Sequence, residues 1–233
     1  MSHSVLHDHE FGDVVCKRTR GRYIRLRVSE HGDITATFPK RAALRHVQEL
    51  LEKSRLQLRE LRDTQLAKRV VYCDGMTIGH SHTLSLTSTS DTTASKRIHG
   101  QILALQIPLQ WDTNSGEGRA FIAGQVKAVL RREARAYLPR RLACLADRHG
   151  FHYQTVRFGN PRGRWGSCSS RGTISLNVAL MNAPLDVIDY VLIHELAHTQ
   201  HMNHSPAFWG TVERCFPAYK AARAYLKLMS PIC

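Results

Sequence analysis

In the carboxyl-terminal half of the chain, three histidines and one glutamate have the residue types and the spacing that could hold a metal ion. The segment reads H-E-x-x-H-x-x-x-x-x-H, from His194 through Glu195 and His198 to His204. Histidines four residues apart lie one turn apart on one helix face, so their rings can converge on one ion. A glutamate beside the first histidine can take a proton from a metal-bound water. The pattern therefore predicts a hydrolytic zinc site with Glu195 as its base.

The sequence around this motif predicts the elements that would position it. The mostly apolar run from Val187 to Ile193 favours a buried helix over about 184–201. Asn203 tolerates the left-handed conformation that ends helices. Ser205 and Pro206 form an N-cap followed by proline at the first helical position. We therefore expect the chain to reverse at 202–205 and to start a new helix at Pro206.

Other residues compete for the third ligand position. His201 is seven residues after His194, about 10 Å along the axis of a straight helix, which is too far for a shared ion. Glu213 on the following helix is the second candidate beside His204. Two further interpretations stay open: the histidines could be ordinary core residues, or a bound zinc could only stabilise the fold.

Three sequence words carry a family resemblance: R-W-G-S-C at 164–168, I-D-Y-V-L-I-H-E-L-A-H at 188–198, and N-H-S-P-A-F-W at 203–209. In this order they resemble the YgjP-like metal-dependent hydrolases, relatives of SprT-like and minimal zincin peptidases. The resemblance implies that His194, His198 and His204 hold Zn²⁺ and that Glu195 is the general base. The histidine spacing equals that of metzincins, but His201 occupies the metzincin glycine position and no Met-turn is present.

The resemblance also implies that the R-W-G-S-C segment borders the active site. Gly166 favours a tight bend there, and Trp165 is expected to pack under the metal helix. Arg164 is a candidate for binding a substrate carboxylate or phosphate, or for stabilising an oxyanion. The strand at 174–177, with Asn177 as a further substrate-binding candidate, could pair with an extended peptide by analogy with zincins. Cys168 is interpreted as a packing residue.

The wider chain predicts an α+β protein with a β-rich amino-terminal region (1–115) containing one helix, and a zincin-like catalytic domain (116–233). The first ten residues are expected to be frayed. The expected strands are 24–28, 34–38 (after a turn at 31–33), 77–79, 83–86, 103–107, 151–163 and 172–177, with a loop at 87–95. The expected helices are 40–68, 119–148 with a kink at Pro139, 184–201 and 206–229 with a break at Pro217.

Composition limits the choice of partners. Lys and Arg outnumber Asp and Glu by 33 to 19, a net charge of +14, and arginines cluster near 18–27, 131–141 and 157–171. Such a surface attracts nucleic acid, nucleotides or acidic partners, or is simply solvated. The six cysteines show no short spacing, which predicts reduced thiols and a cytoplasmic protein. No apolar run is long enough for a membrane span, and the start lacks a secretory pattern.

From these features we expect a zinc-dependent hydrolase, and specifically a metallopeptidase acting on a peptide or protein. Two alternatives are a metal-dependent nucleotide pyrophosphatase, which would suit the basic charge, and a nucleic-acid-associated adaptor with a structural zinc. The retained Glu195 argues against the adaptor, because a structural site has no use for a general base.

Overall fold

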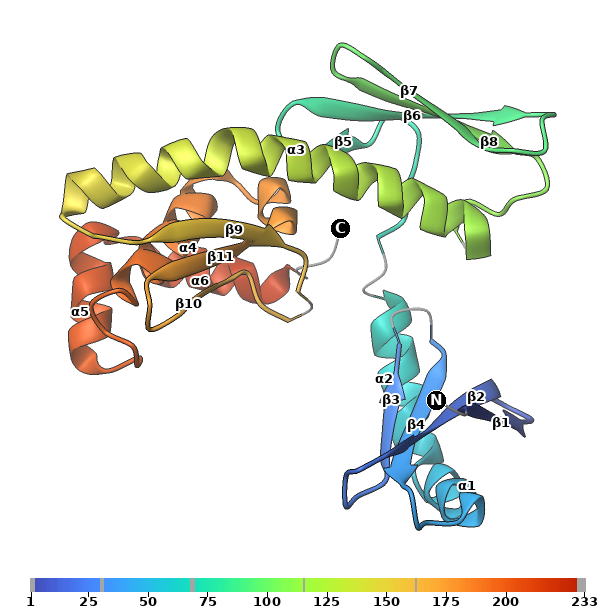
Figure 1. Cartoon of the computed structure of the whole chain (residues 1–233). Coiled ribbons are helices and arrows are strands. Elements are labelled where there is room, and N and C mark those ends of the chain that lie inside the picture. Colours follow the sequence, from blue (N-terminus) through green and yellow to red (C-terminus); the bar gives the residue numbers. More distant parts are fainter. Residues whose placement is uncertain (1–2, 30–31, 68–69, 115, 162, 230–233) are drawn as a thin grey trace. The chain divides into compact units, whose positions relative to one another are not determined.

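The computed structural model describes residues 3–29, 32–67, 70–114, 116–161 and 163–229, and has the expected α+β fold (Figure 1). The chain divides into two compact units, residues 1–69 and residues 70–233. We call them unit 1 and unit 2. None of the helices among the described residues is long and apolar enough to cross a membrane.

Unit 1 is a four-stranded sheet with two helices against one face. The strand order is β1-β2-β4-β3, with β2 and β4 parallel and the other pairs antiparallel. Alternate residues of β4 (Ile34, Ala36 and Phe38) are fully buried against helix residues such as Val47 and Leu51. Its elements are β1 (His3–Asp8), β2 (Gly12–Thr19), β3 (Arg25–Val28), β4 (Ile34–Pro39), α1 (Leu44–Lys53) and α2 (Arg55–Ala67).

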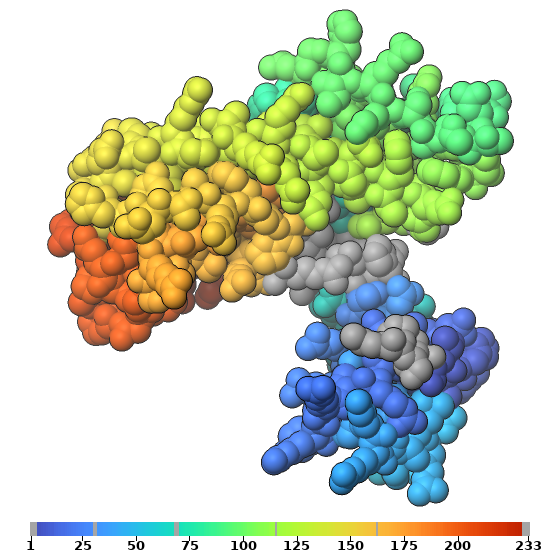
Figure 2. All heavy atoms as spheres, in the orientation of Figure 1, coloured from blue at the N-terminus to red at the C-terminus, as the bar shows by residue number. Residues whose placement is uncertain are grey.

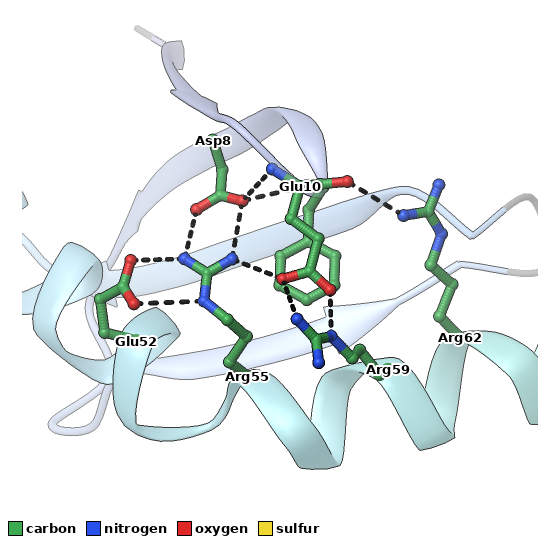
Figure 3. A network of polar contacts seen from close by, with 7 residues as sticks. Asp8, Glu10, Glu52, Arg55, Arg59 and Arg62 are labelled. Atoms are coloured by element: carbon green, nitrogen blue, oxygen red, sulfur yellow. Dashed lines mark hydrogen bonds and ion pairs between the residues drawn. The ribbon is translucent and has the colours of Figure 1, made fainter.

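An ion-pair network ties the β1–β2 turn to α2 (Figure 3). The Arg55 guanidinium lies 3.0 Å from the Asp8 carboxylate and 2.8 Å from that of Glu10, and it also pairs with Glu52. Arg59 forms a second pair with Glu10. The expectation of a frayed start was wrong, because β1 pairs with β2 along its length and Asp8 accepts hydrogen bonds from the backbone of the turn.

Unit 2 combines two sheets with a long helix between them (Figure 1). The first sheet has the order β5-β6-β8-β7 and the second β10-β11-β9. Its elements are β5 (Thr77–Ile78), β6 (His82–Thr89), β7 (Ser95–His99), β8 (Ile102–Pro108), α3 (Gly116–His149), β9 (Thr155–Gly159), β10 (Gly166–Cys168), β11 (Thr173–Asn177), the 3₁₀ helix η1 (Val178–Asn182), α4 (Leu185–Ala197), α5 (Pro206–Cys215) and α6 (Tyr219–Leu228).

Along the sequence, the boundary between the two compact units falls between residues 69 and 70, whereas the expected domain boundary falls between residues 115 and 116. The reason is a shared core, since the β5–β8 sheet and α3 bury their apolar residues in one cluster with α4. Polar contacts reinforce it: the backbone N–H of Gly79 donates to Asn182 Oδ1 (3.1 Å), and that of His80 donates to Glu133 Oε2 (3.0 Å). That residues 116–233 suffice as a catalytic domain stays a prediction.

Most other expected elements agree with the structure. The single helix expected at 40–68 is two helices that meet at Ser54. The loop expected at 87–95 is shorter, because β6 continues to Thr89 and β7 begins at Ser95. Pro139 lies within α3, and the break at Pro217 separates α5 from α6. His31, in the expected 31–33 turn, lies outside the described residues.

Candidate metal centre

Three histidine rings converge at the end of α4. The ligand-competent atoms of His194, His198 and His204 all lie within 4.8 Å of one another. The Nε2 atoms of His194 and His204 are 3.2 Å apart. Two nitrogens bound to one tetrahedral zinc at about 2.1 Å would be about 3.4 Å apart. The three side chains therefore fit a single ion of that size with little rearrangement.

Helix α4 positions the first two histidines. Its residues Ile188, Leu192 and Leu196 are completely buried, which fixes the rotation of the helix about its axis. The rings of His194 and His198, one turn apart, have centroids 4.9 Å apart and meet edge to face. Burial of the apolar stripe thus turns both imidazoles to the same side.

A reversal of the chain brings in the third histidine, as expected from the sequence. The Ser205 hydroxyl accepts a hydrogen bond from Phe208 N, and Pro206 opens α5. His204, just before this cap, reaches the other two rings. Glu213 does not belong to the cluster; it is exposed and lies 3.8 Å from Lys220 Nζ.

Two aromatic side chains from the first turn of α5 support the rings. Phe208 is fully buried and stacks on His198, with ring centroids 4.5 Å apart. Trp209 stacks on His204 with centroids 5.6 Å apart. Sequence reasoning assigned no role to either residue. The available signal was a pair of aromatic residues one turn after the third histidine.

The surroundings keep the imidazoles of His194 and His198 neutral, as metal ligands must be. Burial, together with a smaller contribution from the neighbouring His198 and His204, lowers the pKa of His194 to about 3. Burial also lowers the pKa of His198. The Nδ1 of His198 lies 3.0 Å from the carbonyl oxygen of His201. A proton on Nδ1 would donate to that oxygen and leave Nε2 free to bind a metal. His201 thus contributes through its backbone.

Glu195 is a buried carboxylate beside the histidines. Only 4% of the residue is exposed, and its Oε2 has no hydrogen-bond partner. Desolvation raises its pKa to about 8, and the positive charge of Arg164 opposes that rise. Gly166 packs directly on the carboxylate, since a Cβ there would lie 2.5 Å from Oε1. A buried carboxylate without a partner commonly marks a functional site.

The R-W-G-S-C segment bends at Trp165, one residue before the bend expected at Gly166, and then forms strand β10, where the missing Cβ of Gly166 allows the close approach of Glu195. It pairs antiparallel with β11, which in turn pairs with β9. The strand at 174–177 is therefore central, and the expectation that it presents an edge was wrong. The edge next to Glu195 belongs to β10. Trp165 packs against the main core, as expected.

The remaining candidates occupy different positions. Asn177 is completely buried; its side chain donates to the carbonyl oxygens of Pro161 (3.0 Å) and Arg164 (3.1 Å). These hydrogen bonds hold Pro161 and the backbone of Arg164 in place. The side chain of Arg164 itself is exposed. Burial, together with the charge of Glu195, raises the pKa of the Cys168 thiol, which disfavours a thiolate ligand or nucleophile.

Known proteins that are similar to this chain include metallopeptidases. Among solved structures, the chain is similar to the metallopeptidase zymogen abylysin of Pyrococcus abyssi, with 33% identity, a TM-score of 0.35, and coverage of 39% of this chain and 93% of that one. It is also similar to the metallopeptidase zymogen jannalysin of Methanocaldococcus jannaschii, with 18% identity, a TM-score of 0.34, and coverage of 39% and 91%. No curated protein matches. The model of the YgjP-like metallopeptidase domain matches residues 22–229, and the chain therefore belongs to the YgjP-like family, whose fold class and metal-dependent chemistry the sequence predicted.

Proposed function

We propose that the chain is a zinc-dependent peptidase in which His194, His198 and His204 hold Zn²⁺ and Glu195 is the general base. The observation that carries this proposal is the convergence of three imidazoles beside a buried carboxyl group whose Oε2 has no hydrogen-bond partner among the described residues. Imidazole nitrogens suit zinc, and three protein ligands leave the fourth tetrahedral position open for chemistry.

When bound, zinc acts as a Lewis acid on the scissile carbonyl and lowers the pKa of water to about 7. Glu195 removes the proton of the attacking water through its free Oε2. The same carboxyl group then donates that proton to the leaving amine. The enclosure of Glu195 by Gly166 keeps its carboxylate in one orientation during both transfers.

Strand β10 provides a place for the peptide backbone. It lies at the end of the β10-β11-β9 order, so its outer edge has no neighbouring strand within that sheet. An extended peptide can add to such an edge through main-chain hydrogen bonds. Because Gly166 of β10 contacts Glu195, a peptide paired there would pass next to the base. Arg164 lies two residues before Gly166, the first residue of β10, and would bind the substrate carbonyl or carboxylate.

A hydrolysis screen tests the proposal. Zinc-loaded protein is incubated with a mixture of unstructured peptides and, separately, with nucleoside triphosphates. We expect peptide cleavage that a chelator abolishes and that zinc restores. Glu195→Gln should lose cleavage by at least about 10²-fold. Glu213→Gln, an exposed carboxylate outside the histidine cluster, is the matched control and should retain it. Cleavage of nucleotides without any peptide cleavage would contradict the proposal.

A further inference from the structure

The sheet of unit 1 has one face that no other element of that unit covers. Helices α1 and α2 pack against the opposite face through the core around Phe38 and Val47. Ile24 and Leu26 also pack on that core, while Arg25 and Arg27 between and after them are exposed. In β2, Val14 and Cys16 are buried on the core side. The alternation of side chains places Lys17 on the opposite side, where it is exposed. We call the side that carries Lys17, Arg25 and Arg27 the open face.

The strand register arranges the open face into rows with a gradient of charge. Lys17, Thr37 and Arg25 are aligned in one row, because β4 pairs with β2 on one side and β3 on the other. The next row holds Val15, Thr35 and Arg27. Among the described residues of these rows, the acidic ones come at the far end, where they already have partners. His7 Nδ1 lies 2.9 Å from Asp13, and the Ser29 hydroxyl donates to Asp33 at 3.2 Å.

The basic end of the open face continues into the segment between β2 and β3. Arg20 and Arg22 are exposed there, and Tyr23 is 73% exposed. Figure 2 shows blue side chains of unit 1, a colour range that includes this segment, standing out from the surface. Among the described residues, no carboxylate pairs with Lys17, Arg25 or Arg27, or with these two arginines. The open face and this segment together thus carry five exposed cations and one solvent-exposed aromatic ring.

We propose that the open face binds single-stranded nucleic acid without reading its sequence. Cations without carboxylate partners neutralise phosphates, and arginine matches phosphate geometry with two parallel hydrogen bonds. A sheet surface with an exposed aromatic ring offers a stacking platform for an unpaired base, which a duplex does not present. The combination therefore favours single strands, and it is independent of the metal centre.

The basic face of α3 is the competing surface. Lys127, Arg131, Arg132 and Arg135 line a trough of about 450 Å³, together with Gly124 and Ala128. No aromatic residue lines it, so it could hold phosphates but could not stack a base. Nucleic acid bound at this trough should show no preference for single strands over duplexes. That difference separates the two surfaces experimentally.

Binding of fluorescent 20-nucleotide oligo(U) and oligo(dT) to the full chain, followed by anisotropy at 0.1 M salt, tests the proposal. Both single strands should bind more tightly than a 20-base-pair duplex. Tyr23→Ala should weaken binding by between about 5-fold and 150-fold, the usual range for one stacked base, and Tyr23→Phe should not. Arg25→Gln/Arg27→Gln should reduce the salt slope by about 1.4, for two lost phosphate contacts on a single strand.

The control is Lys127→Gln/Arg131→Gln/Arg135→Gln on α3, which removes more charge than the double variant. This surface belongs to the other unit and no aromatic residue lines it, so the variant should keep binding within about 3-fold. Circular dichroism confirms that each variant is folded. Equal loss in the α3 variant, equal affinity for the duplex, or unchanged binding by Tyr23→Ala would overturn the proposal. Each of these outcomes leaves the peptidase proposal untouched, because none depends on the histidines.

Discussion

The carboxylates of unit 1 and the carboxyl group of Glu195 in unit 2 differ in whether they have a charged partner. In unit 1, Asp8 and Glu10 meet the guanidinium groups of Arg55 and Arg59, and the turn and helix are held together by those pairs. In unit 2, Glu195 is more deeply enclosed but has an oxygen without a partner, and desolvation raises its pKa to about 8. A satisfied network contributes to the fold, whereas an unsatisfied buried carboxylate costs stability and is typical of function.

The largest expected effect comes from neutralising one carboxylate of each kind. Glu195→Gln should lower the hydrolysis rate by at least about 10²-fold while leaving the unfolding midpoint unchanged or higher, because Oε2 of the carboxyl group has no hydrogen-bond partner among the described residues to lose. Asp8→Asn should do the reverse, lowering the midpoint of unit 1 without affecting hydrolysis. Activity assays and thermal melts on the same two preparations measure both. A lower midpoint for Glu195→Gln would show that its carboxylate is a structural partner.

Gly166→Ala is expected to damage the site without damaging the fold. The new Cβ would lie 2.5 Å from Glu195 Oε1, so the carboxylate must move, and a displacement of about 1 Å can reduce the rate by about 10²-fold. Gly210→Ala on α5 is the control, since nothing lies within 4 Å of its added Cβ. Steady-state kinetics compare them. Full activity in Gly166→Ala would show that Glu195 tolerates displacement.

Arg55→Ala should lower the unfolding midpoint of unit 1 on the order of 5 °C, because three carboxylates lose a shared partner. Arg45→Ala, an exposed arginine on α1, removes the same charge without breaking a pair and should have little effect. Differential scanning calorimetry distinguishes them. Similar midpoints for the two variants would mean that the network contributes nothing beyond net charge.

The smallest expected effect is on the pH at which unit 1 unfolds in acid. Hydrogen bonds from Arg59 and Arg55 lower the pKa of Glu10 to about 2. Desolvation alone would raise the pKa of Asp8, but the hydrogen bonds from Arg55 and from the backbone of Phe11 and Glu10 together outweigh it, and the pKa is lowered. Lowered folded-state pKa values add stability that is present above the unfolded values near 4 and is lost as pH falls towards 2. In acid titrations by circular dichroism, Arg59→Gln should therefore unfold at a higher pH than the parent. Coincident transitions would contradict this linkage.

The sequence predicted the local features of the site well. The spacing of His194 and His198 follows from helix geometry, and the Ser205–Pro206 signal placed the reversal that delivers His204. The roles of Gly166 and Asn177 depended on long-range packing, which neither spacing nor propensity encodes. A glycine in a short word suggested a bend, because its contact with Glu195, 29 residues later in the chain, cannot be read locally.

The unit boundary shows the same limit. Residues 111–118 have the composition of a linker, yet the sheet before them shares a core with the helix after them. Linker composition reports local solvation and not which faces are buried together. The paired start of unit 1 is similar, because β1 is held by its register with β2 and by a guanidinium 47 residues away.

The most direct test of the account is the zinc stoichiometry and affinity of His204→Ala and Glu213→Ala beside the parent chain. Equilibrium dialysis against buffered zinc, followed by metal analysis, gives both quantities without an activity assay. The account predicts one zinc per chain in the parent and in Glu213→Ala, and at least about 10-fold weaker binding in His204→Ala. Full retention by His204→Ala with loss in Glu213→Ala would contradict the three-histidine centre.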